Sequence, residues 1–172
     1  MRDSGQPLPK MADVEFRAFS QTGEDGLLLF VLTSIGFTNR YVVELGCGDG
    51  RECNTANLII NHGCHGLLVD GNPELVAIGR HFYGESKDTR IWPPRLVSAF
   101  ISCQNVNSLL RENGAQGEID LLSIDLDGMD FWIWESLDAV SPRVVMVEAN
   151  NIWGATETVA VPYDAHFVAD IV

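Results

Sequence analysis

The chain has 172 residues, 46% of them hydrophobic and 20% charged, which is typical of one globular α/β domain with a sizeable core. Its 24 acidic and 11 basic side chains give a net charge of −13. Such a surface repels phosphate backbones and argues against nucleic acid as a partner. The longest apolar run, residues 27–32, is far too short to span a bilayer, so we expect no membrane partner.

The N-terminal residues 1–17 are predicted to form a flexible lead-in, because they are polar and contain proline. They lack the apolar core of a secretory signal. Residues 18–172 then form one domain. The four cysteines include no Cys-x-x-Cys pair and no zinc-finger spacing to histidine, which favours free, buried thiols in a reducing compartment. We therefore expect a cytoplasmic protein.

The sequence Ser20-Gln-Thr-Gly-Glu-Asp-Gly26 predicts the start of a helix that runs to about Ile35. Ser20 is of the type that caps helices, and two acids follow in the early turns, where the helix dipole favours them. A second interpretation is that the polar residues of this stretch fold over a bound cofactor as a lid: Ser20, Gln21, Glu24 and Asp25.

Strands and helices alternate along the rest of the chain. We expect strands at residues 41–45, 66–69, 95–101, 119–124 and 144–147, and helices at 54–61, 73–82, 104–112 and 131–137. Residues 150–172 carry mixed signals and no clear helix. This alternation predicts a Rossmann-like, doubly wound, mainly parallel sheet with right-handed crossovers.

A glycine-rich turn follows the first predicted strand, in the stretch Glu44-Leu-Gly-Cys-Gly-Asp-Gly50. Such strand-to-helix turns are frequent nucleotide sites, because glycine lets backbone amides approach a ligand closely. A dinucleotide fingerprint needs a small residue where Arg51 stands, so the turn fits NAD poorly. The pattern matches instead the acidic-x-Gly-x-Gly-x-Gly turn of class I methyltransferases that use S-adenosylmethionine (SAM).

Asp70 ends the second predicted strand, at the same edge of the sheet as the glycine turn. A carboxylate there can accept hydrogen bonds from both ribose hydroxyls of an adenosyl group, although an Asp before Gly71 and Asn72 can also serve only a turn. NAD and SAM both use such an acid. We expect the cofactor to contact a set of residues at these strand ends: Glu44, Gly46, Cys47, Gly48, Asp70, Gly71, Ser102 and Asp125.

Acidic residues follow the fourth and fifth predicted strands. Asp125, Asp127 and Asp130 come after one, and Glu148 and Asn150 after the other. Carboxylates clustered at one edge repel one another unless a proton or a cation intervenes. Oxygen ligands from Asp125, Glu148 and Asn150 would suit Mg²⁺, which could lower the pKa of an acceptor hydroxyl. Alternatively, Asp127 and Asp130 cap the next helix and Asp125 binds the methionine end of SAM.

The candidates for acid–base chemistry are Asp125, Asp127 and His166. The histidine is included because it follows the fifth predicted strand, whereas the other histidines are scattered along the chain.

Five motifs together resemble the FkbM-like family of SAM-dependent methyltransferases. They occur in the order 20–26, 43–50, 66–71, 121–130 and 147–150. The resemblance implies O-methylation of a hydroxyl on a small molecule or sugar. It also implies that Glu44, Gly46, Gly48 and Asp70 hold the cofactor and that Asp125 lies at the junction of cofactor and acceptor.

The full methyltransferase sheet has seven strands, whereas this chain stops at Val172, too early for the last two. We therefore expect five strands and an uncovered fifth strand, an edge through which a homo-oligomer would form. Two further hypotheses remain open from the sequence: a non-catalytic SAM-binding or interaction module, and an NAD-dependent oxidoreductase.

Overall fold

The computed structural model describes residues 7–149, 159–165 and 167. A 3₁₀ turn at Met11–Asp13 precedes the main elements, which alternate as the sequence predicted. In chain order they are α1 (Glu24–Ile35), β1 (Tyr41–Leu45), α2 (Ala56–His62), β2 (His65–Asp70), α3 (Pro73–Glu85), β3 (Arg95–Ser98), α4 (Val106–Glu112), β4 (Gly117–Ile124), α5 (Asp130–Ser136) and β5 (Val140–Val147). No helix within the described residues is long and apolar enough to cross a membrane.

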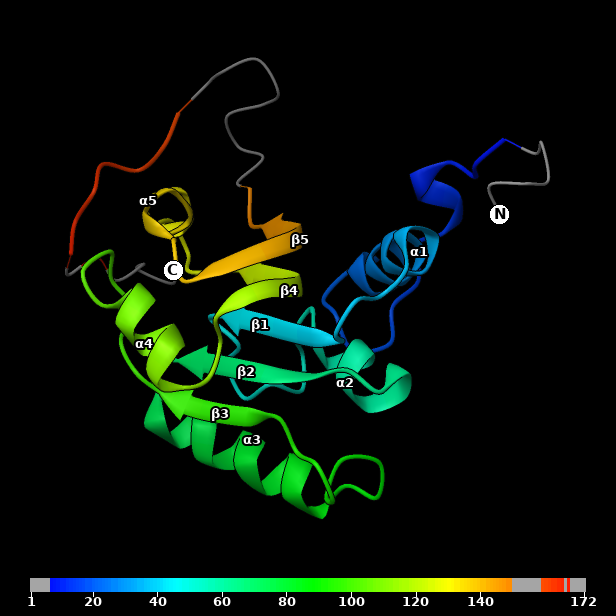
Figure 1. Cartoon of the computed structure of the whole chain (residues 1–172), viewed down its shortest axis with the longest axis horizontal. Helices are drawn as coiled ribbons and strands as arrows, with labels where there is room; N and C mark the ends of the chain where they lie inside the picture. Colours follow the sequence, from blue (N-terminus) through cyan, green and yellow to red (C-terminus); the bar gives the residue numbers. More distant parts are fainter. Residues whose placement is uncertain (1–6, 150–158, 166, 168–172) are drawn as a thin grey trace.

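The five strands form one parallel sheet in the order β3-β2-β1-β4-β5 (Figure 1). Leu45, the last residue of β1, lies opposite Val69 of β2 and Ile124 of β4. Ile124 in turn lies opposite Val147 of β5. The residues that follow these positions therefore reach the same edge of the sheet. The Rossmann-like, doubly wound α/β fold is confirmed.

Helices cover both faces of the sheet, as parallel strands require. One hydrophobic core joins Val43 of β1 to Leu110 of α4 and Ile133 of α5. Successive strand residues point to opposite faces, so the neighbouring Val42 belongs to the second core. That core joins the sheet to the three remaining helices through Leu32 of α1, Leu58 of α2 and Val76 of α3.

β5 lies at an edge of the sheet and pairs with β4, as the sequence predicted. It begins at Val140, four residues earlier than expected, and includes Pro142. Proline lacks the N–H that a second neighbouring strand would need, so it is tolerated in an edge strand. Most of β5 is half-buried. Assembly of a homo-oligomer through this edge stays a prediction.

The prediction that Ser20 is the N-cap of α1 is wrong, because the helix begins at Glu24 and Gly23 holds the N-cap position. Ser20 is buried, and its hydroxyl accepts the N–H of Asp25 at 3.1 Å. The Asp25 carboxylate accepts the backbone N–H groups of residues 18–20 at 2.7–2.8 Å. This motif therefore fixes the segment before α1 against the first turn of the helix.

β3 ends at Ser98, three residues earlier than predicted. The next residue, Ala99, still donates its N–H to the Asp70 carbonyl at 2.9 Å. The chain then leaves the sheet, so Phe100, Ile101 and Ser102 line a pocket at the strand ends instead of continuing the strand.

Asp120 of β4 connects the sheet to the loop before β1. Its carboxylate is fully buried and accepts the backbone N–H groups of Thr38, Asn39 and Arg40 at 2.7–3.1 Å. It also forms an ion pair with Arg143 of β5 at 2.8 Å. These contacts offset the cost of burying the charge.

We predict that Asp120→Asn lowers the free energy of unfolding by about 3 kcal/mol, because the amide leaves Arg143 without its counter-charge and presents an NH₂ group to backbone donors. The matched control is Asp138→Asn, which removes the exposed ion pair with Arg111 and should cost less than about 1 kcal/mol. Urea denaturation measures both, and equal losses would contradict the prediction.

Candidate functional site

A cavity of about 810 Å³ opens at the carboxyl ends of the strands. The structure brings all eight residues that the sequence predicted for cofactor binding into its lining: Glu44, Gly46, Cys47, Gly48, Asp70, Gly71, Ser102 and Asp125. Asp127 and Glu148 line it too. The other two predicted site residues, Asn150 and His166, lie outside the described residues.

Four backbone amides of the glycine turn donate to acceptors within the protein. Gly46 and Cys47 donate to the Val69 carbonyl at 2.9 and 3.1 Å, and Gly50 donates to the Cys47 carbonyl at 2.8 Å. Gly48 donates to the Asp70 carboxylate at 2.7 Å. The turn therefore offers none of these N–H groups to a phosphate, unlike a phosphate-binding loop.

Gly46 allows β1 and β4 to meet at the floor of the cavity. Its φ of +86° suits glycine, and a Cβ at this position would overlap the carbonyl oxygen of Asp125. The Asp125 N–H donates to the Leu45 carbonyl at 2.9 Å. This close approach places the Asp125 side chain beside the glycine turn.

Glu44 lies beneath the glycine turn and is only 1% exposed. Its two carboxylate oxygens accept the N–H groups of Asn54 and Thr55, each at 2.9 Å, where α2 begins. Asn54 also donates to Ser123 of β4 at 3.0 Å. Glu44 thus occupies the positive end of the α2 dipole, where a ligand phosphate would otherwise bind.

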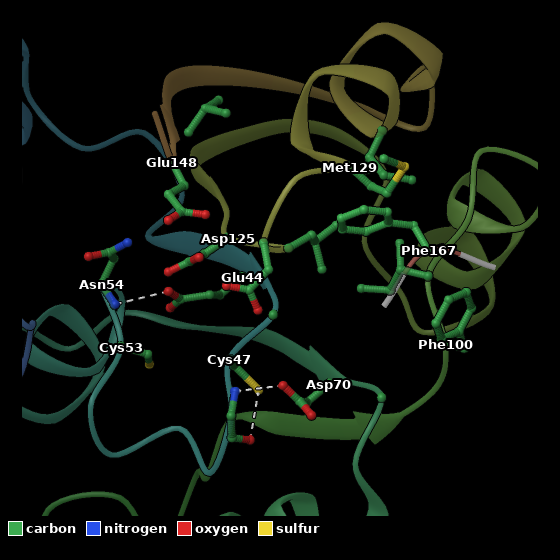
Figure 2. Close-up of a pocket in the computed structure, with 18 of the residues that line it drawn as sticks. Glu44, Cys47, Cys53, Asn54, Asp70, Phe100, Asp125, Met129, Glu148 and Phe167 are labelled. Carbon is green, nitrogen blue, oxygen red and sulfur yellow. Dashed lines mark hydrogen bonds between the residues drawn. The ribbon is translucent and has the colours of Figure 1, made fainter. Parts of the chain in front are cut away.

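The Asp70 carboxylate accepts hydrogen bonds within the turn and also faces the cavity (Figure 2). One carboxylate oxygen accepts the Gly48 N–H, and the other accepts the Asn72 N–H at 2.8 Å. Because each carboxylate oxygen accepts two hydrogen bonds, one position on each remains for a ligand. Two ribose hydroxyls would match these positions.

Three carboxylates gather at the ends of β4 and β5. One oxygen each from Asp125, Asp127 and Glu148 lies within 4.8 Å of the others. Figure 2 shows Asp125 and Glu148 directed toward one another. Asn54, whose importance the sequence did not indicate, lies close to this group in the same view. We call Asp125, Asp127 and Glu148 the acidic cluster.

The loop from β4 to α5 is held by Asp130, whose carboxylate accepts the N–H groups of Leu126 and Gly128 at 2.8 and 2.9 Å. The alternative in which Asp127 caps α5 is wrong, because Met129 holds the N-cap position without a side-chain hydrogen bond. Asp127 adopts a positive φ of 53°. Strained backbone of this kind persists where the surroundings hold it, often at functional sites.

Two carboxyl groups of the acidic cluster, those of Asp125 and Glu148, have raised pKa values. The pKa of Asp125 rises to about 7 because of burial and of repulsion by Glu148 and then Asp127. The pKa of Glu148 is also raised, by burial and then by Asp130 and Asp127, while a hydrogen bond with Asp125 partly opposes the rise. A pKa of about 7 for Asp125 lies in the range that suits acid–base chemistry near neutral pH.

The donor set of the acidic cluster fits a hard divalent cation. Three carboxylate oxygens from two adjacent strand ends suit Mg²⁺, which takes oxygen ligands and keeps several waters. Asp127 takes part here, although the sequence had indicated Asp125, Glu148 and Asn150.

An apolar wall lies opposite the acidic cluster, where Figure 2 shows Phe100, Met129 and Phe167 close together. Sequence reasoning missed these residues, and it missed Tyr163 in the same lining. A predicted strand end at residue 98 would have indicated that Phe100 lies in the loop that lines the cavity. Of the four residues in the lid interpretation, Gln21 and Glu24 line the cavity. Ser20 and Asp25 do not, because they are buried and hydrogen-bonded to each other.

No family model matches this chain, and no curated protein matches it. The fold and the pocket therefore define its class: a Rossmann-like α/β domain with a ligand pocket at the carboxyl ends of its strands. The resemblance to the FkbM-like family stays a prediction.

We predict that Gly46→Ala lowers the free energy of unfolding by about 3 kcal/mol or more, because the new Cβ forces β1 and β4 apart. The control is Gly48→Ala in the same turn, where φ is also positive but no atom lies within 4 Å of a built Cβ. Its cost should be about 1 kcal/mol, from backbone strain alone. Urea denaturation distinguishes the two, and equal losses would show that the close approach does not matter.

We predict that Asp125→Asn changes how stability depends on pH in the presence of a chelator. A pKa raised to about 7 means that folded Asp125 keeps its proton where the unfolded chain loses it. The wild type therefore loses stability as pH rises from about 4 to about 7, and the variant escapes this loss. The variant should be more stable by about 1–2 kcal/mol at pH 8, a reduced figure because the side chain is half exposed.

Thermal unfolding between pH 4 and pH 8 measures this difference. Glu85→Gln, an exposed change at the end of α3, controls for net charge. A stability difference between wild type and Asp125→Asn that does not change with pH would contradict the prediction.

Proposed function

We propose that this protein is a SAM-dependent methyltransferase that methylates a hydroxyl on a small molecule or sugar. One observation carries the proposal: Asp70 and the acidic cluster open into the same cavity, on either side of the glycine turn. The first suits the ribose of the cofactor, and the second suits an acceptor that must lose a proton.

The paired amides favour SAM over NAD. The pyrophosphate of NAD needs backbone N–H donors and a free helix N-terminus. Here the four amides of the turn donate internally, and Glu44 occupies the start of α2. Arg51 forms an ion pair with its neighbour Asp49 instead of lining the cavity. SAM carries no phosphate, so this arrangement suits it.

The lining indicates which end of the cofactor would lie where. Asp70 at the end of β2 would bind the ribose, and Phe100 and Ile101 after β3 would contact the adenine ring. Asp125 lies at the end of β4, on the other side of β1. The methionine end would therefore point toward the acidic cluster, across the crevice at which the strand order reverses.

The residues of this chain would act mainly by orienting the reactants and by taking a proton. SAM, when bound, supplies a methyl group on a sulfonium that an oxygen nucleophile attacks in line. Positioning of the two reactants accounts for much of the rate in such a reaction. Whichever carboxylate of Asp125 and Glu148 is ionised would accept the proton of the acceptor hydroxyl.

We include Mg²⁺ in this proposal as a second group that Asp125, Asp127 and Glu148 would hold. When bound, it supplies a Lewis acid that lowers the pKa of the acceptor hydroxyl. The repulsion within the acidic cluster supports this part of the proposal, because a divalent cation relieves it.

A cytoplasmic location belongs to the proposal as well. All four cysteines are free, and burial raises the pKa of Cys47, Cys53 and Cys64. Buried thiols with raised pKa values act as small apolar side chains and suit a reducing compartment.

Calorimetric titration with SAM, S-adenosylhomocysteine and NAD tests the proposal. We expect the first two to bind and NAD to fail. Asp70→Asn should weaken SAM binding by about tenfold or more, because charge-assisted hydrogen bonds to the ribose are lost. Asp88→Asn, an exposed change in the loop before β3, is the matched control. Absence of SAM binding to the folded protein would overturn the proposal.

Methyl transfer to a panel of sugars and phenols, with Mg²⁺ and with a chelator, completes the test. Turnover is expected, and it should fall in Asp125→Asn. Binding of SAM without turnover on any acceptor would favour the non-catalytic SAM-binding module instead.

A further inference from the structure

Part of the cavity is lined by apolar side chains, and every charged side chain among its described lining residues is acidic. No lysine, arginine or histidine is among its described residues, whereas eight of them carry carboxylates: Glu24, Glu44, Glu52, Asp70, Asp125, Asp127, Glu148 and Asp164. A cleft lined by one sign of charge concentrates ligands of the opposite sign and repels ligands of the same sign.

These carboxylates come from separate parts of the chain and surround the cavity. Glu24 lies in the first turn of α1, Glu52 in the loop after β1, and Asp70 at the end of β2. The acidic cluster contributes from β4 and β5, and Figure 2 shows Glu44, Asp125 and Glu148 close together there. The negative potential therefore extends through the whole site.

Within the described part of the chain, Arg17 contacts the lining through an ion pair with Glu52 at 3.2 Å. Both side chains are more than half exposed, so water and salt screen the pair and it changes the potential little.

We propose that this pocket selects its ligands by charge: it prefers the methyl donor SAM, whose sulfonium gives it a net positive charge, to its product, whose net charge is zero, and it takes an acceptor without phosphate or carboxylate groups. This inference rests on the proposed function, which supplies the two ligands compared. The acceptor class that follows is a neutral polyol or phenol, or a hydroxyl compound that bears an amine.

The change of charge during the reaction should affect product release. The bond from sulfur to the methyl carbon breaks, and a bond from the methyl carbon to the acceptor oxygen forms. The electron pair stays on sulfur, which becomes a neutral thioether, while the hydroxyl proton leaves to a carboxylate or to water. The pocket therefore attracts the product less strongly than the donor, and the chemical step itself promotes product release.

Calorimetry with a chelator present tests the selection between donor and product. At about 20 mM salt, SAM should bind about tenfold more tightly than S-adenosylhomocysteine. At about 500 mM salt the ratio should approach one, because screening shortens the range of the charges. Equal affinities at low salt, or tighter binding of the product, would overturn the inference. Binding of neither ligand would refute the proposed function instead.

A substitution in the lining tests whether the preference for SAM arises from charges in the pocket. Burial raises the pKa of Glu24, but hydrogen bonds from Thr22 outweigh this and hold it below its ordinary value, so Glu24 is ionised at neutral pH. Glu24→Gln keeps the shape of the side chain and should reduce the ratio of the two affinities about twofold to threefold. Glu85→Gln makes the same change in net charge outside the lining and should leave the ratio unaltered. Equal effects of the two variants would overturn the inference.

Adenosine and adenosine 5′-monophosphate test the exclusion of anions directly. The two differ only by a phosphate, and the pocket should bind the monophosphate at least about tenfold more weakly at low salt. Equal or tighter binding of the monophosphate would show that the carboxylates do not control which ligands enter.

Discussion

The close approach of β1 and β4 at Gly46 determines where the residues of the candidate site lie. A side chain there would overlap the Asp125 carbonyl oxygen, and the hydrogen bond between Asp125 and Leu45 keeps the strand ends in contact. Because the strands are parallel and in register, Asp70 and Glu148 end at the same level. The proposed cofactor side and the proposed acceptor side of the cavity therefore meet at one glycine.

The strands and their alternation with helices could be predicted, because buried parallel strands need apolar and β-branched runs that suit little else. Element boundaries depended on tertiary contacts that no local pattern shows. α1 begins late because Asp25 binds the backbone of residues 18–20. β3 ends early because the chain turns away after Ala99 pairs with Asp70. Because the predicted strand extended to residue 101, Phe100 was not identified as a pocket residue.

The site residues at strand ends could be predicted for the same reason that the sheet could: parallel strands finish at one edge. What each side chain does there could not. Glu44 looked like a ligand contact, yet its hydrogen bonds hold the start of α2. The glycine turn looked like a source of free amides, yet four of its amides are paired within the protein. In the proposed function, recognition would therefore depend on side chains, and above all on carboxylates.

The electrostatic repulsion within the acidic cluster has the same consequence for three positively charged species. Folding brings Asp125, Asp127 and Glu148 together against their mutual repulsion, and the raised pKa of Asp125 is the first sign of it. A proton, a divalent cation and a sulfonium would each relieve that repulsion. Because they relieve the same repulsion, the binding of one reduces what the next can gain, and by linkage the effect is reciprocal. In the proposed function, proton uptake, metal affinity and preference for the methyl donor would thus be coupled through a single group of carboxylates.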